Sequence, residues 1–533
     1  MNKIALYLNQ HLLGEVSSAK PLRKLYSTDG SILHVDPEIV AFPRVTNDIR
    51  KIARFTWQLA EKGHTVGVTV RGYGGDVTGA AIGKGIVIDT SKQLNAIIEV
   101  AAKDKLIHVQ PGAALSQIEE ALRWQGLTVP GAFHRGMQQV SVGGAIANDS
   151  LGVNGAVSDA IKRLEVVLAN GDIIETGKLS RREVSKKLGL QTFEGEIYRK
   201  LEGLLEDNAE LIDRIASKEI RSNTGYKRIT DIKDKDGAID LTPLFIGSQG
   251  TLGIISEAVL KADFLSLNET HAVITTASVR EARDLSERLI ELQPAELTVI
   301  DGELLRRATK HGSQFSLLGS VEQTGAVIYI RFNDFSDRTQ QKKLKKMQKL
   351  LTKMKIGFID STERAAEDFR GITVIGQVLQ LATGDDAVAL PILNGSSVPS
   401  TRCEEFEASL QELGQKHHVE LPTEFNVLTC TYTVYPLLKL DSVSDKQKLF
   451  KLMTDYAALV TRCGGAFTAD GAEGRVKVPA AWATLSDDEV ELYAKVREIF
   501  DPFGTLNPGV KQQTELRSIV AALRSSYDST SVL

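Results

Sequence analysis

The chain has 533 residues, of which 42% are hydrophobic and 25% are charged. This composition is typical of a soluble globular protein with about two to four folding units, and it excludes disorder over most of the length. A net charge of −4 excludes the strong positive field of a nucleic-acid-binding protein. Three cysteines exclude a disulfide scaffold. Together with the lack of a signal peptide or of about 18 consecutive apolar residues, they favour a reducing cytoplasm.

Short strands and helices alternate between glycines in the first 265 residues. Apolar side chains on one face predict a helix over residues 47–62, which Gly63 ends. We expect strands at residues 65–70 and 85–89, an amphipathic helix at 114–125, and hairpins over 94–110 and 164–175. The second hairpin contains an Asn170-Gly171 pair, which is typical of a type I′ turn.

Glycine becomes sparse from about residue 270 to 460, where helices predominate around strands such as residues 325–332. Residues 340–355 carry seven lysines opposite an apolar stripe and predict an amphipathic helix. Two interpretations of Lys342 to Lys355 stay open: a solvated outer face of a domain, or a peripheral contact with anionic lipid at the inner membrane face. After residue 512 the Ser-rich end is expected to fray.

Two glycine-rich segments do not fit the common nucleotide-binding motifs. In the segment from Arg71, Val77 stands where the G-x-G-x-x-G fingerprint needs its third glycine. A phosphate loop around Gly83-Lys84 would need glycine and Ser or Thr where the chain has Thr78 and Gly85. The remaining interpretation is that the segments around 71–77 and 140–147 present backbone N–H groups to one diphosphate, without a helix dipole.

Four segments, in this order and spacing, carry a family resemblance: Arg71–Gly75, Val142–Gly144, Gly247–Ala258 and Asn507–Gly509. The chain resembles the FAD-linked oxidases of the vanillyl-alcohol oxidase (PCMH) type, in the branch of glycolate oxidase and D-lactate dehydrogenase. The resemblance implies an α+β fold: a two-part PCMH-type FAD-binding domain and a substrate (cap) domain with an antiparallel sheet. The expected boundaries are 1–265 (PCMH-type core about 36–178), 266–462, and a C-terminal return over 463–533 with a frayed tail.

The resemblance also implies which residues bind FAD. The segments 71–75 and 141–145 would hold the pyrophosphate, residues 247–255 would line the far side of the cofactor, and Asn507 would help to close the site near the flavin. The residues so implied are Arg71, Gly72, Tyr73, Gly74, Gly75, Asp76, Gly79, Ser141, Val142, Gly143, Gly144, Ala147, Asn148, Gly152, Gly250, Thr251, Gly253, Ile254, Ile255 and Asn507.

Attachment of FAD is expected to be non-covalent. Many relatives link FAD through a His just after the first glycine loop, where this chain has Gly75, and others use a Cys in the second segment, whereas the first cysteine here is Cys403. His134 is the nearby nucleophile. It stays open between a loop histidine and a contact with flavin or substrate.

The branch usually carries C-terminal histidines that bind a divalent metal or act as the base. Here Gly471 stands at the catalytic His position and no histidine follows His418, so we expect no metal site. The proton acceptor would then come from another group. The candidates are Asp470, Glu473, Tyr432 and Tyr435 for the base, and Arg475 and Arg402, with Arg370 as a weaker third, for a substrate carboxylate.

The function implied by the resemblance is that of an FAD-linked oxidase or dehydrogenase acting on CH–OH donors. Such an enzyme oxidises a small-molecule alcohol by hydride transfer to flavin. The substrate stays open between a 2-hydroxy acid and a sugar, alditol or other alcohol, and the electron acceptor and oligomeric state stay unknown. An alternative from another class is a flavin-binding subunit that needs a partner for turnover.

Overall fold

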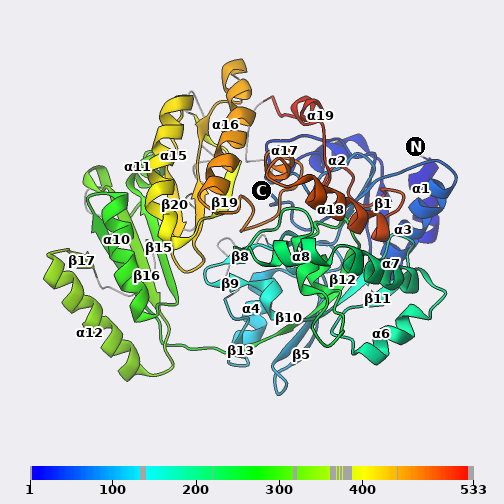
Figure 1. Cartoon of the computed structure of the whole chain (residues 1–533), viewed down its shortest axis with the longest axis horizontal. Coiled ribbons are helices and arrows are strands. Elements are labelled where there is room, and N and C mark those ends of the chain that lie inside the picture. Colours follow the sequence, from blue (N-terminus) through cyan, green and yellow to red (C-terminus); the bar gives the residue numbers. More distant parts are fainter. Residues whose placement is uncertain are drawn as a thin grey trace.

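Three large sheets and the helices around them organise the chain (Figure 1). A computed structural model describes residues 3–131, 140–218, 220–315, 321–359, 387–440 and 442–525, with residues 368, 371 and 375. Two sheets are built within residues 15–261 and the third within residues 270–434. The fold is α+β, as expected.

A four-stranded sheet positions the first glycine loop. Its strand order is β1 (Glu15–Ser17), β2 (Ile39–Phe42), β4 (Ile86–Asp89) and β3 (Val68–Arg71). Strands β2, β4 and β3 are parallel, and the helix α3 (Thr46–Glu61) buries Ile49 and Ile52 in the same core cluster. Because β3 ends at Arg71, the glycine loop begins at the carboxyl end of a parallel strand, where α/β sheets bind ligands.

A five-stranded antiparallel sheet adjoins it in sequence, in the order β11 (Ile173–Glu175), β10 (Ile161–Val167), β12 (Ile254–Lys261), β6 (Leu106–Val109) and β5 (Ile97–Ala101). Both predicted hairpins are confirmed. The type I′ turn is wrong: in the Asn170-Gly171 pair only Gly171 has a positive φ, of 83°. The connection is therefore a longer loop over residues 168–172, with a left-handed glycine at Gly171.

A seven-stranded antiparallel sheet forms the second half. Its order is β17 (Phe358–Ile359), β14 (Thr270–Thr276), β16 (Ala326–Phe332), β15 (Glu296–Asp301), β20 (Thr423–Asn426), β21 (Thr431–Val434) and β19 (Leu393–Ser397). The helices α10 (Val279–Leu289), α12 (Asp337–Met354), α15 (Cys403–His417) and α16 (Val443–Arg462) lie against this half of the molecule (Figure 1). Its β19–β21–β20 end lies toward the first half.

Other elements complete the part of the chain that the structure describes. The helices are α1 (Lys3–His11), α2 (Lys20–Leu25), α4 (Leu115–Arg123), α5 (Val142–Asn148), α6 (Arg181–Leu188), α7 (Phe193–Asp207), α8 (Ala209–Ala216), α9 (Thr242–Phe245), α11 (Gly302–Lys310), α17 (Val478–Trp482), α18 (Asp487–Phe500) and α19 (Leu516–Ala521). The strands are β7 (Leu127–Thr128), β8 (Leu151–Gly152), β9 (Gly155–Ala156), β13 (Asp263–Phe264), β18 (Val388–Ala389) and β22 (Leu437–Leu438).

The lysine-rich helix α12 uses its apolar face inside the protein. Met347 and Leu351 are fully buried, and Leu344 packs against the same core cluster. A helix that lies in a membrane surface needs that face free for the lipid. The lipid contact proposed for Lys342 to Lys355 therefore lacks support, and α12 fits the solvated outer face of the large sheet. In the part of the chain that the structure describes, every helix is too short or too polar to cross a bilayer.

The C-terminal segment returns to the first half of the molecule. Leu506 bridges to Val68 of β3, and α18 packs against α7 (Figure 1). The Ser-rich end for which fraying is expected lies beyond residue 525, outside the described residues. Leu523 bridges to Leu33, and the guanidinium of Arg524 donates to the Leu33 carbonyl oxygen at 3.0 Å. The chain is thus tied down at least as far as residue 524.

Candidate active site

A cavity of about 540 Å³ opens between the glycine segments of the first half and the β19–β21–β20 end of the large sheet. Its lining includes the first glycine loop, α5, residues 248–255, and Asp470-Gly471. Its size is typical of a pocket for a cofactor or small molecule. Both the expected cofactor segments and the expected substrate domain therefore contribute to one site.

The first glycine loop is folded back on itself by Asp76. The Asp76 carboxylate accepts the backbone N–H groups of Thr78 at 3.1 Å and Ala80 at 2.7 Å. In the described part of the chain, no acceptor pairs with the backbone N–H groups of Tyr73, Gly74 and Gly75, which all line the cavity. Three successive donors without a protein partner form the kind of concavity that binds a phosphate.

The second glycine segment differs from the expected concavity without a helix dipole, because it begins the helix α5. Ser141 caps this helix, and its hydroxyl accepts the N–H of Gly144 at 3.2 Å. The N–H of Gly143 donates to the Pro111 carbonyl oxygen at 2.8 Å. These two glycines line the cavity, but their N–H groups are already engaged within the protein. A Cβ at Gly143 would also lie only 2.8 Å from the Pro111 side chain, so this glycine permits close packing.

The third segment supplies an open wall. A Cβ at Gly250, where φ is 71°, would meet no other atom within 4 Å. Behind this wall the Nδ2 of Asn507 donates to the carbonyl oxygens of Gln249 at 2.8 Å and Ala80 at 2.9 Å, which joins the third segment to the first. The unpaired N–H groups of the first loop and the open glycine wall fit a diphosphate-linked cofactor such as FAD.

Most of the residues implied to bind FAD line the cavity. They are Gly72, Tyr73, Gly74, Gly75, Asp76, Ser141, Gly143, Gly144, Ala147, Asn148, Gly152, Gly250, Gly253, Ile254 and Ile255. Five others lie behind the lining: Arg71, Gly79, Val142, Thr251 and Asn507. Arg71 braces the first loop from behind, since its guanidinium donates to the Thr28 carbonyl oxygen at 2.6 Å.

Among the residues proposed for catalysis, Tyr435 lines the cavity, and so does Asp470. Its Oδ1 accepts the backbone N–H of Leu151 at 2.8 Å. Its other oxygen has no hydrogen-bond partner among the described residues. Burial raises the pKa of Asp470 above the usual range, and the Leu151 N–H opposes this shift.

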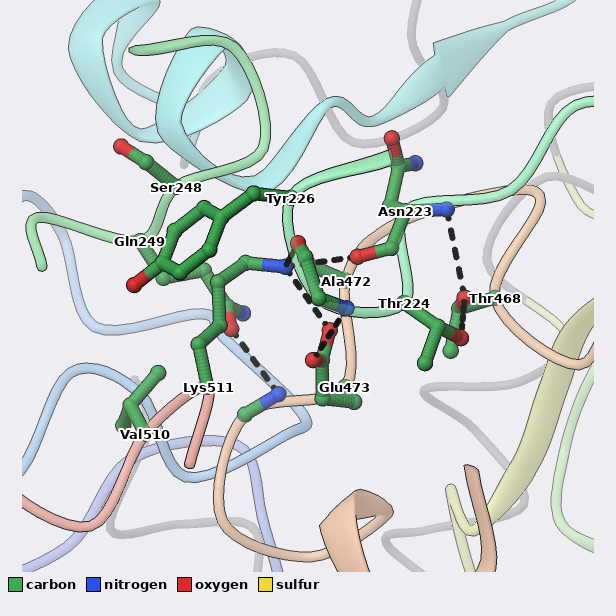
Figure 2. A network of polar contacts seen from close by, with 12 residues as sticks. Asn223, Thr224, Tyr226, Ser248, Gln249, Thr468, Ala472, Glu473, Val510 and Lys511 are labelled. Carbon is green, nitrogen blue, oxygen red and sulfur yellow. Dashed lines mark hydrogen bonds and ion pairs between the residues drawn. The ribbon is translucent and has the colours of Figure 1, made fainter. Parts of the chain in front are cut away.

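Glu473 lies outside the cavity lining, in a buried network shown in Figure 2. One of its oxygens accepts the N–H groups of Gly225 and of the Trp482 indole, both at 2.9 Å, and the other pairs with the Lys511 ammonium at 2.9 Å. Lys511 also donates to the carbonyl oxygens of Asn223 and Gly225 at 2.6 and 2.7 Å. The pair therefore joins three distant chain segments, which is a structural task.

Tyr432 lies on the other face of its strand. Its ring stacks on Phe425 with centroids 4.3 Å apart, and its hydroxyl donates to Glu407 at 3.0 Å. Phe425 and Tyr432 alternate with the cavity-lining residues along their strands. Their rings therefore lie on the face of the sheet that points away from the cavity.

Neither proposed arginine reaches the cavity. Arg475 is half-buried, and it donates to the Gly79 carbonyl oxygen at 2.5 Å, to Asn507 Oδ1 at 2.9 Å and to the Pro508 carbonyl oxygen at 2.7 Å. Burial lowers its pKa to about 10. Arg402 is exposed and forms an ion pair with Glu405. Arg475 thus braces the FAD-side loops, and Arg402 lies on the surface.

Other residues in the cavity wall were not singled out from the sequence. Strands β19, β21 and β20 contribute the side chains of Asn394, Thr431, Thr433, Glu424 and Asn426. Tyr435, which the sequence did offer as a base, follows β21, and its hydroxyl donates to Glu424 at 3.3 Å. The sequence carried one signal for these residues: polar side chains stand at every second position of 424–426 and 431–433, as on one face of a strand. His134 and Arg370 lie outside the described residues. Among the described residues, no cluster of three or more His, Cys, Asp or Glu side chains could hold a metal ion.

Comparisons with known proteins agree with this geometry. Residues 37–177 match the family model described as "FAD binding domain", and residues 267–510 match "FAD linked oxidases, C-terminal domain". The chain is 25% identical to D-2-hydroxyglutarate dehydrogenase of Pantoea ananatis over 97% of its own length, but it spans only 52% of that relative. It is 23% identical to glycolate oxidase subunit GlcD of Bacillus subtilis, covering 94% of this chain and 95% of the relative.

The fold is shared with solved structures of oxidases. The 4-ethylphenol oxidase from Gulosibacter chungangensis superposes with a TM-score of 0.68 at 14% identity, covering 97% of this chain and 99% of that one. Both halves of the chain match family models, and the cavity is lined by residues from the two matched regions. The protein therefore belongs to the FAD-linked oxidases.

Proposed function

We propose that the protein oxidises a CH–OH group of a small molecule, with FAD bound in the cavity and Asp470 as the proton acceptor. The observation that carries this proposal is the Asp470 carboxyl group in the cavity wall. When bound, FAD supplies a hydride acceptor for the carbon that is oxidised. The hydroxyl proton must go to a protein group, and Asp470 is suited to take it.

The environment of Asp470 fits a general base. Its Oδ1 is fixed by the Leu151 N–H, which leaves one oxygen for a substrate hydroxyl. A carboxylate whose pKa is raised by burial holds a proton more strongly than an exposed one, so it is a better base near neutral pH. Glu473, Tyr432, Arg475 and Arg402 are assigned no direct contact with substrate.

The names of the relatives suggest where to look for the substrate. They act on 2-hydroxy acids, such as D-2-hydroxyglutarate, and one is named as a subunit of glycolate oxidase. Because the chain spans about half of the first of these, partners or further domains could be needed for turnover. A flavin-binding subunit that needs a partner is therefore the second candidate function. The three cysteines form no disulfide, which supports a cytoplasmic location.

FAD is expected to be released completely by acid. Gly75 and Asp76 follow the first loop where relatives carry a linking His, and the three cysteines are free and lie at residues 403, 430 and 463. The flavin absorbance of the purified protein should move entirely to the supernatant on acid precipitation. Flavin that stays in the pellet would contradict non-covalent binding.

Anaerobic titration of the flavin tests the proposed activity. Alcohols from both substrate classes should be added to the FAD-loaded protein while the visible flavin bands are recorded. Bleaching by at least one of them supports alcohol oxidation. If dithionite reduces the flavin but no alcohol does, and an artificial acceptor gives no turnover, the second candidate function is favoured.

A further inference from the structure

The large sheet presents a polar face to the cavity in two cross-strand rows. In the first row Asn394 of β19 is opposite Thr433 of β21, which is opposite Glu424 of β20. In the second row Thr431 is opposite Asn426. All five residues line the cavity, while the intervening Phe425 and Tyr432 face away.

The first row is held rigidly beside Asp470. The backbone carbonyl oxygen of Asn394 accepts a hydrogen bond from the ammonium of Lys477 at 2.5 Å, and the Lys477 side chain is fully buried. The next carbonyl oxygen, of Gly395, accepts the backbone N–H groups of Ala469 at 2.8 Å and Asp470 at 2.9 Å. Gly395 has a φ of 75°, and a Cβ there would collide with the Asp470 carbonyl oxygen. Asn394 and Asp470 therefore lie on two segments that are hydrogen-bonded to each other.

Hydrogen-bonding capacity differs between the two rows. Asn426 is occupied by the protein, since its amide donates to the Val153 carbonyl oxygen at 3.0 Å and accepts the Leu428 N–H at 3.0 Å. By contrast, the buried Oδ1 of Asn394 has no hydrogen-bond partner among the residues that the structure describes. No partner of the Thr433 hydroxyl or of the second Asp470 oxygen is found in the described part of the chain. Buried polar groups normally have partners, so unpaired groups in a cavity wall indicate ligand contacts.

We infer, resting on the proposed oxidation of an alcohol, that the substrate is an uncharged polyhydroxylated molecule, a sugar or an alditol. One hydroxyl lies at Asp470 and neighbouring hydroxyls bind Asn394 and Thr433. Hydroxyl groups both donate and accept, so they match an amide, a hydroxyl and a carboxylate. The carboxylate of a 2-hydroxy acid only accepts, and it would face the carboxyl groups of Asp470 and Glu424 in the same wall.

The oxidation balances with FAD as the oxidant. When bound, FAD would accept the hydrogen and the electron pair of the C–H bond that breaks. The O–H proton would pass to Asp470 as the carbonyl group forms. The cross-strand row does no chemistry in this step; it positions the polyol.

The full-length FAD-loaded protein can test this inference by anaerobic stopped-flow. Flavin reduction should be measured with xylitol, D-sorbitol and D-glucose, and with glycolate, D-lactate and D-2-hydroxyglutarate. We expect the best polyol to exceed the best hydroxy acid at least tenfold in the ratio of limiting rate to apparent Kd. A hydroxy acid that exceeds every polyol would overturn the inference and leave the proposed oxidation intact. If no alcohol reduces the flavin, the proposed function falls and the inference with it.

The variant Thr433→Val tests the row itself, because it removes one hydroxyl and keeps the shape and the strand preference of the side chain. The apparent Kd of the best polyol should rise about tenfold, as for the loss of one ligand hydrogen bond, with the limiting rate unchanged within about twofold. Thr423→Val is the matched control, because Thr423 is buried on the adjacent strand and does not line the cavity. Equal effects of the two variants would contradict a role of Thr433 in binding.

Discussion

Replacing Asp470 with Asn is expected to slow flavin reduction by the best alcohol about 10²–10⁴-fold, the range that a positioned general base contributes. The amide keeps an oxygen that can accept the Leu151 N–H, so the loop should keep its geometry. What is lost is the ability to take the hydroxyl proton. Anaerobic stopped-flow of the FAD-loaded variant measures the effect directly.

Two controls separate chemistry from binding. The flavin content and the rate of reduction by dithionite should be unchanged in Asp470→Asn, because the proposed FAD contacts do not involve the charge of Asp470. Asp104→Asn removes an exposed carboxylate in the turn after β5 and should leave flavin reduction at the level of the original chain. Retention of more than about a tenth of the original rate by Asp470→Asn would exclude Asp470 as the general base.

The pH dependence gives an independent check of the same carboxyl group. A base must be deprotonated to act, so the limiting rate should fall as the pH drops through the pKa of Asp470. Burial raises that pKa above the ordinary range of an aspartic acid, so the fall should begin at a higher pH than for an exposed carboxylate. The residual rate of Asp470→Asn should lack this titration. An identical pH profile in the variant would assign the titration to another group.

Local patterns in the sequence predict much of the fold because they depend on neighbouring residues. The helix expected from the apolar stripe of residues 47–62 and the strand expected at residues 325–332 match α3 and β16. The turn at Asn170-Gly171 was predicted wrongly, because a dipeptide preference does not fix how many residues the strands leave unpaired. A similar limit applies to Gly143. The sequence shows a glycine beside the expected cofactor site, but it does not show that this glycine also packs against Pro111.

The site was harder to predict because it depends on which face of a strand meets the cavity. Tyr432 and its neighbours Thr431 and Thr433 alternate, and alternation alone does not say which set faces inward. A phenol looked like the more reactive choice, yet it packs on Phe425 and the threonines line the site. Glu473 shows a second limit, since its cationic partner Lys511 is 38 residues away in sequence. Only the tertiary structure reveals that this carboxylate is already paired.

The Glu473–Lys511 pair leads to a large expected effect on stability. Lys511→Met should destabilise the protein by about 3–5 kcal/mol, the usual result of removing one partner of a buried ion pair. The side chains of Lys511 and Glu473 are 1% and 0% exposed, so solvent cannot replace the lost contact. The carbonyl oxygens of Asn223 and Gly225 would lose their donor as well. Urea unfolding followed by tryptophan fluorescence can measure the change, since Trp482 donates to Glu473.

A surface pair provides the matched control. Lys495→Met removes an exposed partner of Glu491, at 2.7 Å and one helical turn away, and should leave the urea midpoint almost unchanged, because solvent screens this pair. The double variant Glu473→Gln/Lys511→Met should recover part of the loss, because the remaining amide is neutral and still accepts the Gly225 and Trp482 N–H groups.

These variants also decide between the structural and catalytic roles of Glu473. If the pair is structural, folded Lys511→Met protein should reduce its flavin with alcohol at a limiting rate within about threefold of the original, because Asp470 and the cavity wall are retained. If Glu473 were catalytic, removal of its counter-ion Lys511 would change the electrostatic surroundings of a reacting group. The pH profile of the limiting rate would then shift. A stability loss no larger than that of Lys495→Met, with such a shift, would contradict the structural role and return Glu473 to the candidates for the base.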